Sequence, residues 1–374
     1  MLFKMRQKSQ CKTPYYQIDE EKLLKNMKKI DYIRRKSGAS SVLALKCFSA
    51  WAVFPLMRQY MAGTTSSSLY EAKLGHEKFG GETHAFCVAY SKDDIQEIKT
   101  FADKVIFNSV SQLNMFYDEV KHLQIGLRIN PGISYSHFDL ADPARKNSRL
   151  GVLNKDEALQ VLDKINGLMF HYNCENDDFN TFSEMLDKVS TKYEKLLHKV
   201  NWVSLGGGLY FTKDGYPLDK FCKKLKEFSA KYSVQVYLEP GESAITQSCE
   251  LVTTVLDIVH NGKDIAIVDA STEAHMLDLL IYQQPAKIDA KSGKHEYIIA
   301  GKSCLAGDIF GTYKLASKLK IGSEVKFIDT AGYTMVKKNW FNGLNMPSII
   351  VKRLNGKTEV VREFTYSNYL ENMS

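Results

Sequence analysis

The sequence predicts an α/β protein in which a closed (β/α)8 barrel of the TIM type is followed by a second, antiparallel β domain of barrel-like form. Its 374 residues exceed what one minimal core needs, so one large and one smaller domain, or two of similar size, are expected. From about residue 37 to 241, eight short apolar segments alternate with helical patterns, and this barrel requires eight strands. Beyond residue 241, apolar and polar residues alternate or β-branched residues dominate, which is typical of antiparallel strands.

Residues 1–36 are predicted to form a short strand and a helix. The strand lies in TPYYQID, residues 13–19, and we expect it to join the β domain. Over residues 20–36, apolar residues recur at helical spacing; these are Leu23, Leu24, Met27, Ile30 and Ile33. The lysines and arginines between them are expected to form the solvent-exposed face of that helix.

The barrel is assigned to residues 37–241. Its predicted strands are residues 42–46, 64–68, 85–89, 105–108, 125–129, 168–172, 202–206 and 236–240. The second segment, TTSSS, has the least regular pattern because it contains no large apolar residue. An open doubly wound sheet is the structural alternative, but it gives no reason for a count of eight. The polar stretch 131–149 is predicted to be a long loop, and loops of that length are often functional.

The β domain is assigned to residues 242–374. Its predicted strands are residues 251–259, 264–270, 295–301, 324–336 and 347–354. Turn signals such as HNGKD, KSGK and LNGK separate several of them.

Composition indicates an ordinary globular protein with 44% hydrophobic residues and a net charge of +7. A basic balance weakly favours nucleic-acid binding, but no RNA-binding, zinc-finger or helix-turn-helix signature supports it. The seven cysteines form no C-x-x-C pair, which favours free thiols in a reducing compartment over disulfides or a zinc site. The opening residues lack the apolar core of a signal peptide, and no apolar run reaches membrane-spanning length. We therefore expect a cytoplasmic protein without a metal, nucleic-acid or membrane partner.

Unusual residues follow four predicted barrel strands, at the end where such barrels carry their active sites. They are Lys46 after the first strand, His171 after the sixth, Gly206 to Gly208 after the seventh and Glu239 after the eighth. Each has a simpler interpretation: a solvated lysine, a core histidine, a tight turn and a turn carboxylate. The glycines are no dinucleotide fingerprint, because Phe211 stands where G-x-G-x-x-G needs its last glycine, and no P-loop lysine follows.

Together these residues match the needs of pyridoxal 5'-phosphate. A lysine can form a Schiff base with the cofactor, and a carboxylate can keep the pyridine nitrogen protonated so that the ring accepts electrons. An aromatic ring can stack on the cofactor, and glycine N–H groups can approach its phosphate.

The chain resembles the fold-type III pyridoxal-phosphate decarboxylases, which include ornithine, arginine and diaminopimelate decarboxylases. The resemblance covers nearly the whole chain and rests on six motifs in order: ALKCFS, FHYNCEN, LGGGL, EPGE, GKSCLAGD and AGYTMV. It implies that Lys46 holds the cofactor, His171 stacks on its ring, Gly206 to Gly208 and Tyr333 contact its phosphate, and Glu239 faces the ring nitrogen. It also implies a homodimer in which Cys304, the proton donor, and Asp308, a ligand of the substrate's distal amine, reach the site from the partner subunit.

Two departures from the family pattern narrow the resemblance. The family's E-P-G-R reads E-P-G-E here, so Glu242 replaces an arginine, and Thr65 stands where the second-strand motif has an aspartate. With HMLD, which ends in Asp278, this pattern is most similar to the bacterial carboxynorspermidine/carboxyspermidine decarboxylases of polyamine synthesis. The resemblance thus implies decarboxylation of one or both compounds, with Glu242, Asp278 and Asp308 binding substrate amines.

Other interpretations remain open. Diaminopimelate or another basic amino acid is the alternative substrate, although the arginine expected after E-P-G for a second substrate carboxylate is absent. A catalytically inactive relative that binds partners would be expected to lose Lys46 or Cys304, and both are present. A cofactor carrier built from the barrel alone would not need the long β domain.

Overall fold

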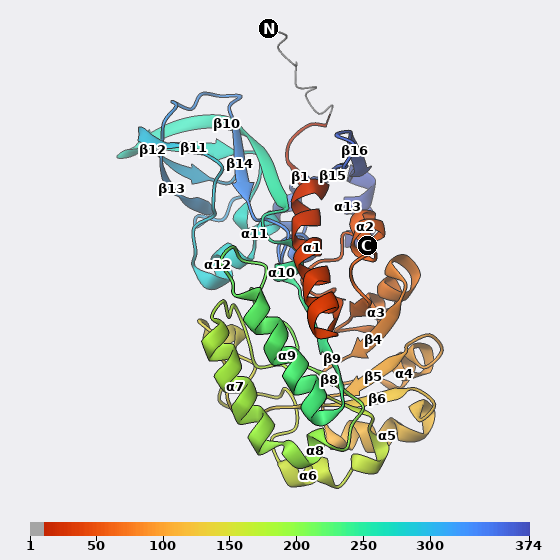
Figure 1. Ribbon diagram of the computed structural model, residues 1–374. Coiled ribbons are helices and arrows are strands. Elements are labelled where there is room, and N and C mark those ends of the chain that lie inside the picture. Colours follow the sequence, from red (N-terminus) through yellow and green to blue (C-terminus); the bar gives the residue numbers. More distant parts are fainter. Residues whose placement is uncertain (1–10) are drawn as a thin grey trace. The chain divides into compact units, whose positions relative to one another are not determined.

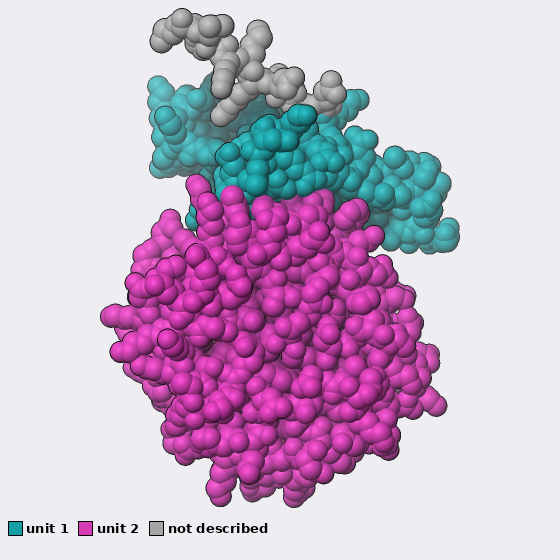
Figure 2. All heavy atoms as spheres, turned by 45° about the vertical axis from the view of Figure 1, so that its right-hand side comes forward, with its two compact units in different colours: residues 1–23, 246–374 teal, residues 24–245 magenta. Residues whose placement is uncertain are grey.

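The computed structural model describes residues 11–374 (Figure 1). The chain divides into two compact units, coloured separately in Figure 2. The barrel unit is Leu24–Ile245, and the β unit is Thr246–Ser374 together with the described part of Met1–Leu23. Among residues 11–374, no helix is long and apolar enough to cross a membrane.

The barrel unit contains the predicted closed barrel. Each strand is parallel to its neighbours, and β2 pairs with β9 to close the ring. The strands are β2 (Ser40–Ala44), β3 (Gly63–Thr65), β4 (Glu82–Phe86), β5 (Lys104–Phe107), β6 (Gln124–Ile129), β7 (Gly167–Phe170), β8 (Trp202–Ser204) and β9 (Gln235–Leu238). All eight predicted segments overlap an observed strand, including TTSSS. The open doubly wound sheet is therefore excluded.

Apart from β6, which ends at Ile129 as predicted, the observed strands end earlier than predicted. After β2 the chain turns at once, because the N–H groups of Cys47 and Phe48 donate to the carbonyl of Ala44 at 3.0 and 3.3 Å. Leu45 is as buried as the strand residues before it, so the apolar pattern did not reveal this turn. Lys46, His171, Gly206 and Glu239 consequently lie on the loops after the strands, where side chains are free to converge.

Helices cover the barrel strands, with α1 (Glu20–Ser37) close to the predicted residues 20–36. Its acidic first turn and basic last turn complement the helix dipole. The helices that follow are α2 (Phe54–Met57), α3 (Leu69–Leu74), α4 (Lys92–Ile98), α5 (Val110–Val120), α6 (Lys155–Leu159), α7 (Phe179–Lys192), α8 (Glu194–Leu197), α9 (Leu218–Tyr232) and α10 (Glu242–Ile245). Ser68, Ser91, Ser109 and Asp178 accept hydrogen bonds from first-turn N–H groups, which fixes where four of these helices begin.

The β unit is a mixed sheet rather than a purely antiparallel one. Its order is β13-β12-β11-β10-β1-β15-β16, with β14 also paired to β10. The strands are β1 (Tyr15–Asp19), β10 (Cys249–Asn261), β11 (Lys263–Val268), β12 (Ser292–Ala300), β13 (Ile309–Leu315), β14 (Glu324–Ile328), β15 (Ser348–Lys352) and β16 (Thr358–Arg362). Two pairs, β11 with β12 and β1 with β15, are parallel. The sequence pattern did not predict this, because alternation along one strand does not specify the direction of its neighbour.

Other differences in the β unit follow from local sequence. β13 and β16 were not predicted; Gly311 interrupts the first, and the second is short and mostly exposed. The segment predicted as a strand over 324–336 ends at Ile328, because Asp329 and Tyr333 take positive φ angles of 60° and 50°. Three helices, α11 (Thr272–His275), α12 (Asp278–Tyr282) and α13 (Tyr366–Met373), complete the unit.

Candidate active site

A pocket at the carboxyl ends of the barrel strands brings predicted site residues together. Lys46, His171 and Glu239 line it, and so does Thr65, the residue that departs from the family pattern. The other lining residues are Ala44, Ser66, Ser67, Phe86, Arg128 and Met169. Residues in or just after six strands, β2, β3, β4, β6, β7 and β9, thus line one pocket, and they include Lys46, His171 and Glu239 of the predicted rim.

Lys46 is presented to this pocket by a fixed turn. The N–H of Ala44 donates to Pro240 at 3.1 Å, and that of Leu45 donates to Thr65 at 3.1 Å. Lys46 as a whole residue keeps solvent access, whereas its neighbours Leu45 and Cys47 are buried, but its ammonium group is surrounded by protein atoms. The surrounding protein removes solvent from the ammonium and lowers the pKa of Lys46, and the charge of Arg128 lowers it further. A lowered pKa increases the neutral amine, which is the form that attacks a carbonyl.

Glu239 is a buried carboxylate with partners on several sides. It is 5% exposed and accepts a 2.5 Å hydrogen bond from Ser204 Oγ. Burial raises the pKa of Glu239, while the Ser204 hydrogen bond and the charges of Lys46 and Arg128 act in the opposite direction. Such a carboxyl group can share a proton with a basic ring nitrogen or keep that nitrogen protonated.

Arg128 is a site residue that the sequence analysis missed. It lies within β6 and is 4% exposed, and its guanidinium carbon is 5.1 Å from the centroid of the Phe86 ring. Burial lowers the pKa of Arg128 to about 10, and the charge of Glu239 opposes this shift. The available signal was an arginine inside the otherwise apolar segment IGLRI, since a buried charge needs a partner.

His171 is held by the glycine loop as a neutral ring. The N–H of Gly207 donates to His171 Nδ1 at 3.1 Å, so the neutral tautomer carries its proton on Nε2. Burial lowers the pKa of His171 well below its ordinary value, and the charges of Lys46 and Arg128 lower it further. A neutral imidazole over the pocket suits stacking on an aromatic cofactor.

Close packing requires glycine at all three positions, and backbone conformation also requires it at Gly206 and Gly208. A Cβ on Gly206 would lie 2.4 Å from His171 Nδ1, and one on Gly208 would lie 2.0 Å from the Asn173 carbonyl oxygen. Both glycines also have positive φ, 69° and 78°. The N–H groups of Gly206 and Gly207 already donate to Ser204 Oγ and His171 Nδ1. Of these three donors, only the N–H of Gly208 is left for a phosphate.

Glu242 begins α10 and is bonded to a tyrosine. The hydroxyl of Tyr210 donates to Glu242 Oε2 at 2.7 Å. Burial raises the pKa of Cys174 to about 11, and the charges of Glu242 and Lys46 also act on this thiol. Glu242 and Lys46 thus each lie near enough to Cys174 for their charges to act on it, but Glu242 is not among the residues that line the pocket of Lys46.

The other predicted site residues, Asp278, Cys304, Asp308 and Tyr333, all lie in the β unit. Asp278 forms an ion pair with Lys337, whose Nζ is 5.3 Å from the centroid of the Tyr333 ring. Cys304 is exposed, while Asp308 is buried. Lys337 thus brings Asp278 and Tyr333 together, although the sequence analysis did not single it out.

The barrel and its pocket define the class of protein. A lysine amine, a buried carboxylate and a neutral ring at the mouth of one barrel fit pyridoxal phosphate, which needs a covalent anchor and a partner for its ring nitrogen. Residues 22–246 match the family described as "Pyridoxal-dependent decarboxylase, pyridoxal binding domain". The chain belongs to this family of decarboxylases, and pyridoxal phosphate is its cofactor.

Similar proteins agree with this assignment. A carboxynorspermidine/carboxyspermidine decarboxylase of Herminiimonas arsenicoxydans is 52% identical over 97% of this chain and 99% of its own. A carboxyaminopropylagmatine decarboxylase of Synechocystis is 33% identical, covering 96% of this chain and 95% of its own. The crystal structure of a Campylobacter jejuni carboxynorspermidine decarboxylase complexed with norspermidine has a TM-score of 0.90 at 35% identity, covering 97% of this chain and 100% of that one.

Proposed function

We propose that this chain removes the α-carboxylate of carboxynorspermidine, carboxyspermidine or both, giving norspermidine and spermidine in polyamine synthesis. The observation that carries the proposal is the barrel pocket in which Lys46 and Glu239 meet. The 52% identity to a protein of that name supports this choice of substrate.

In the proposed reaction, Lys46, His171 and Glu239 of the pocket have roles, and so do Gly208, Tyr333 and Cys304 outside it. Pyridoxal phosphate, when bound, supplies an electron sink for the electron pair of the breaking C–CO₂ bond. Lys46 anchors the cofactor through its amine, and Glu239 holds a proton at the ring nitrogen. His171 would stack on the cofactor as a neutral ring, and the N–H of Gly208 would donate to its phosphate; Tyr333 is the other residue proposed as a phosphate contact. Cys304 then gives its proton to the carbon that has lost CO₂.

The ammonium groups of a carboxy-polyamine substrate need carboxylates in the active site to pair with. Glu242 suits this role because the hydroxyl of Tyr210 orients its side chain. At about 4 Å in a partly screened site, one ammonium–carboxylate attraction is on the order of 4 kcal/mol before desolvation is subtracted. Asp278 is a second candidate, but an ammonium group would have to compete with Lys337 for it.

Glu242→Gln is expected to lower kcat/KM by about 30- to 1000-fold, because a net loss of about 2 to 4 kcal/mol follows from removing one carboxylate of a partly buried charge pair. The absorption spectrum of the bound cofactor should not change, since the cofactor contacts lie elsewhere. Steady-state kinetics with carboxynorspermidine measures the effect.

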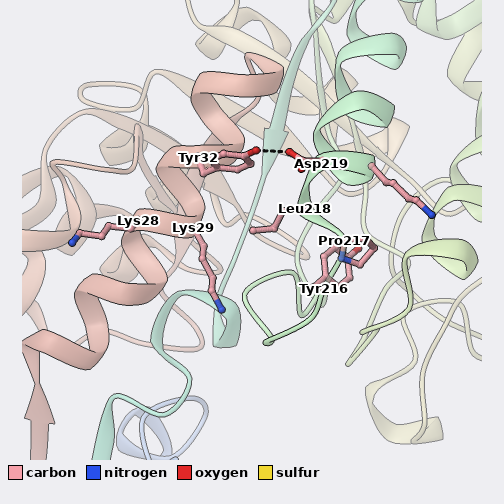
Figure 3. Close-up of a pocket in the computed structure, with 8 residues that line it drawn as sticks. Lys28, Lys29, Tyr32, Tyr216, Pro217, Leu218 and Asp219 are labelled. Carbon is pink, nitrogen blue, oxygen red and sulfur yellow. Dashed lines mark hydrogen bonds between the residues drawn. The ribbon is translucent and has the colours of Figure 1, made fainter.

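Asp219→Asn is the matched control for Glu242→Gln. Asp219 lies at the start of α9 and accepts a hydrogen bond from Tyr32 of α1, so it is also a carboxylate bonded to a tyrosine (Figure 3). It lines a different pocket, with residues that include Lys29 and Tyr216. Unchanged kinetics in both variants would contradict the proposed role of Glu242.

The test of the proposed function is product analysis by mass spectrometry. The holoenzyme is incubated with carboxynorspermidine, carboxyspermidine, carboxyaminopropylagmatine, diaminopimelate, ornithine and arginine. Norspermidine or spermidine should form fastest; faster formation of lysine from diaminopimelate would overturn the proposal. The two carboxy-polyamines differ by one methylene, so the expected preference between them is about 10- to 200-fold at most.

We also propose that the chain forms a homodimer with shared active sites, each combining Lys46 of one subunit with Cys304 of the other. In this arrangement the barrel unit serves as the cofactor domain, and the β unit supplies groups to the partner's site. The exposed position of Cys304 supports this arrangement, since a proton donor must be reachable. All seven cysteines lie among the described residues and none forms a disulfide, which supports the proposed cytoplasmic location.

Mixing inactive Lys46→Ala with inactive Cys304→Ala subunits should restore activity. A mixed dimer contains one site with both residues intact, so random exchange of equal amounts should recover about a quarter of wild-type activity. Subunit exchange is confirmed by native mass spectrometry. Mixtures that exchange subunits yet stay inactive would rule out the shared site.

A further inference from the structure

The turn that carries Cys304 is exposed at its tip and anchored at its base. Cys304, Leu305, Ala306 and Gly307 are exposed, whereas Asp308, the next residue, is 4% exposed. The backbone closes the turn, because the N–H of Gly301 donates to the carbonyl of Asp308 at 2.8 Å and the N–H of Asp308 donates to that of Leu305 at 3.0 Å.

The carboxylate of Asp308 links this turn to α11. Its Oδ1 accepts from the N–H and the hydroxyl of Thr272, at 2.7 and 2.8 Å. Its Oδ2 accepts from the N–H and the hydroxyl of Ser303, at 3.1 and 2.5 Å. Ser303 directly precedes Cys304, and Thr272 is the first residue of α11. The space is tight, since a Cβ on Gly301 would lie 2.3 Å from Asp308 Oδ2.

These contacts leave little capacity for a substrate amine. A carboxylate offers about four acceptor positions, and four donors from Thr272 and Ser303 already point at Asp308. Each oxygen faces a backbone N–H, which can only donate. An asparagine has nearly the same shape as an aspartate. At this position, however, its NH₂ group would face one of these N–H groups, and two donors cannot form a hydrogen bond with each other.

We infer that Asp308 is a positioning residue whose carboxylate holds the turn that presents the Cys304 thiol, rather than a ligand of the substrate's distal amine. A second contact acts on the same turn, since the N–H of Cys304 donates to Asn342 Oδ1 at 2.6 Å. The inference rests on the proposed role of Cys304 as proton donor. It replaces the substrate-binding role that the resemblance implied for Asp308.

Asp308→Asn in the holoenzyme tests this inference. We expect kcat to fall about 10- to 100-fold, as for a reacting group displaced by about 1 Å, while KM stays within about twofold of wild type. Cys304 should react several-fold faster with iodoacetamide, because a loosened turn exposes its thiol in more orientations. Peptide mass spectrometry follows this alkylation, with Cys87 as the internal reference thiol. A rise in KM with unchanged kcat and unchanged alkylation would restore the substrate-binding role and overturn the inference.

Ser303→Ala and Thr272→Val each remove one hydroxyl bond and keep the carboxylate. Both should show a smaller loss of kcat at unchanged KM, and they carry the test if Asp308→Asn does not fold. Cys304→Ala separates the inference from the proposed function. A normal kcat in that variant would overturn the proton-donor role, whereas unchanged alkylation of Cys304 in Asp308→Asn would overturn the positioning alone.

Discussion

Lys46→Ala is expected to abolish both turnover and the visible absorption band of the bound cofactor. The amine of Lys46 has a lowered pKa and lies in the pocket with Glu239 and His171. Because no other lysine among the described residues lines that pocket, no other side chain there can replace it as the covalent anchor. Absorption spectroscopy of the purified holoenzyme measures the band, and the loss of CO₂ from carboxynorspermidine measures turnover.

Lys213→Ala is the control for Lys46→Ala. Lys213 lies in the loop between β8 and α9 and forms an ion pair with Asp177 at an exposed position. Its removal should leave both the band and the turnover unchanged. Retention of the visible band in Lys46→Ala would remove the assignment of Lys46 as the cofactor lysine.

Glu82→Gln is expected to lower the free energy of unfolding by about 2 to 4 kcal/mol. Glu82 begins β4 and accepts hydrogen bonds from Lys104, from His84 Nε2 at 2.9 Å and from the Tyr237 hydroxyl at 2.9 Å. Lys104 is 7% exposed, so the variant leaves a buried ammonium without a counter-charge. Glu82 itself is 34% exposed, which places the expected loss below that of a fully buried pair.

Urea unfolding followed by circular dichroism measures this loss. Asp187→Asn is the control, because Asp187 pairs with Lys224 at the surface and should contribute less than about 1 kcal/mol. An equal and small effect in both variants would contradict the buried-pair explanation.

The same cluster should make wild-type stability depend on acid pH. Hydrogen bonds from His84 and Lys104 outweigh burial and lower the pKa of Glu82 from 4.5 to about 2. The unfolded chain therefore binds a proton at Glu82 before the folded chain does, and stability present above pH 4.5 is lost as the pH falls toward 2. Burial lowers the pKa of His84, so protonation of this residue in the unfolded state adds to the loss below pH 6.5. The Glu82→Gln variant should lack the Glu82 part of this dependence.

The sequence by itself predicted the barrel and three of the residues that line its pocket. Eight apolar segments separated by helical patterns are local features, and each corresponds to an observed strand. Lys46, His171 and Glu239 follow such segments, and because the carboxyl ends of barrel strands share one rim, their convergence followed from the fold. The resemblance to the decarboxylases rested on the same local motifs, and the match over residues 22–246 confirms the family.

Only the tertiary structure decided how these groups are partnered. Arg128 reaches the pocket from β6, and Lys104 meets Glu82 across the paired strands β4 and β5, because strand pairing and register decide which side chains meet. Likewise, the N–H of Gly207 donates to His171, and the carboxylate of Asp308 accepts hydrogen bonds from Thr272 and Ser303. A motif states which polar groups are present. Whether a group is still available for a ligand depends on the hydrogen bonds it makes within the fold, which involve residues outside the motif.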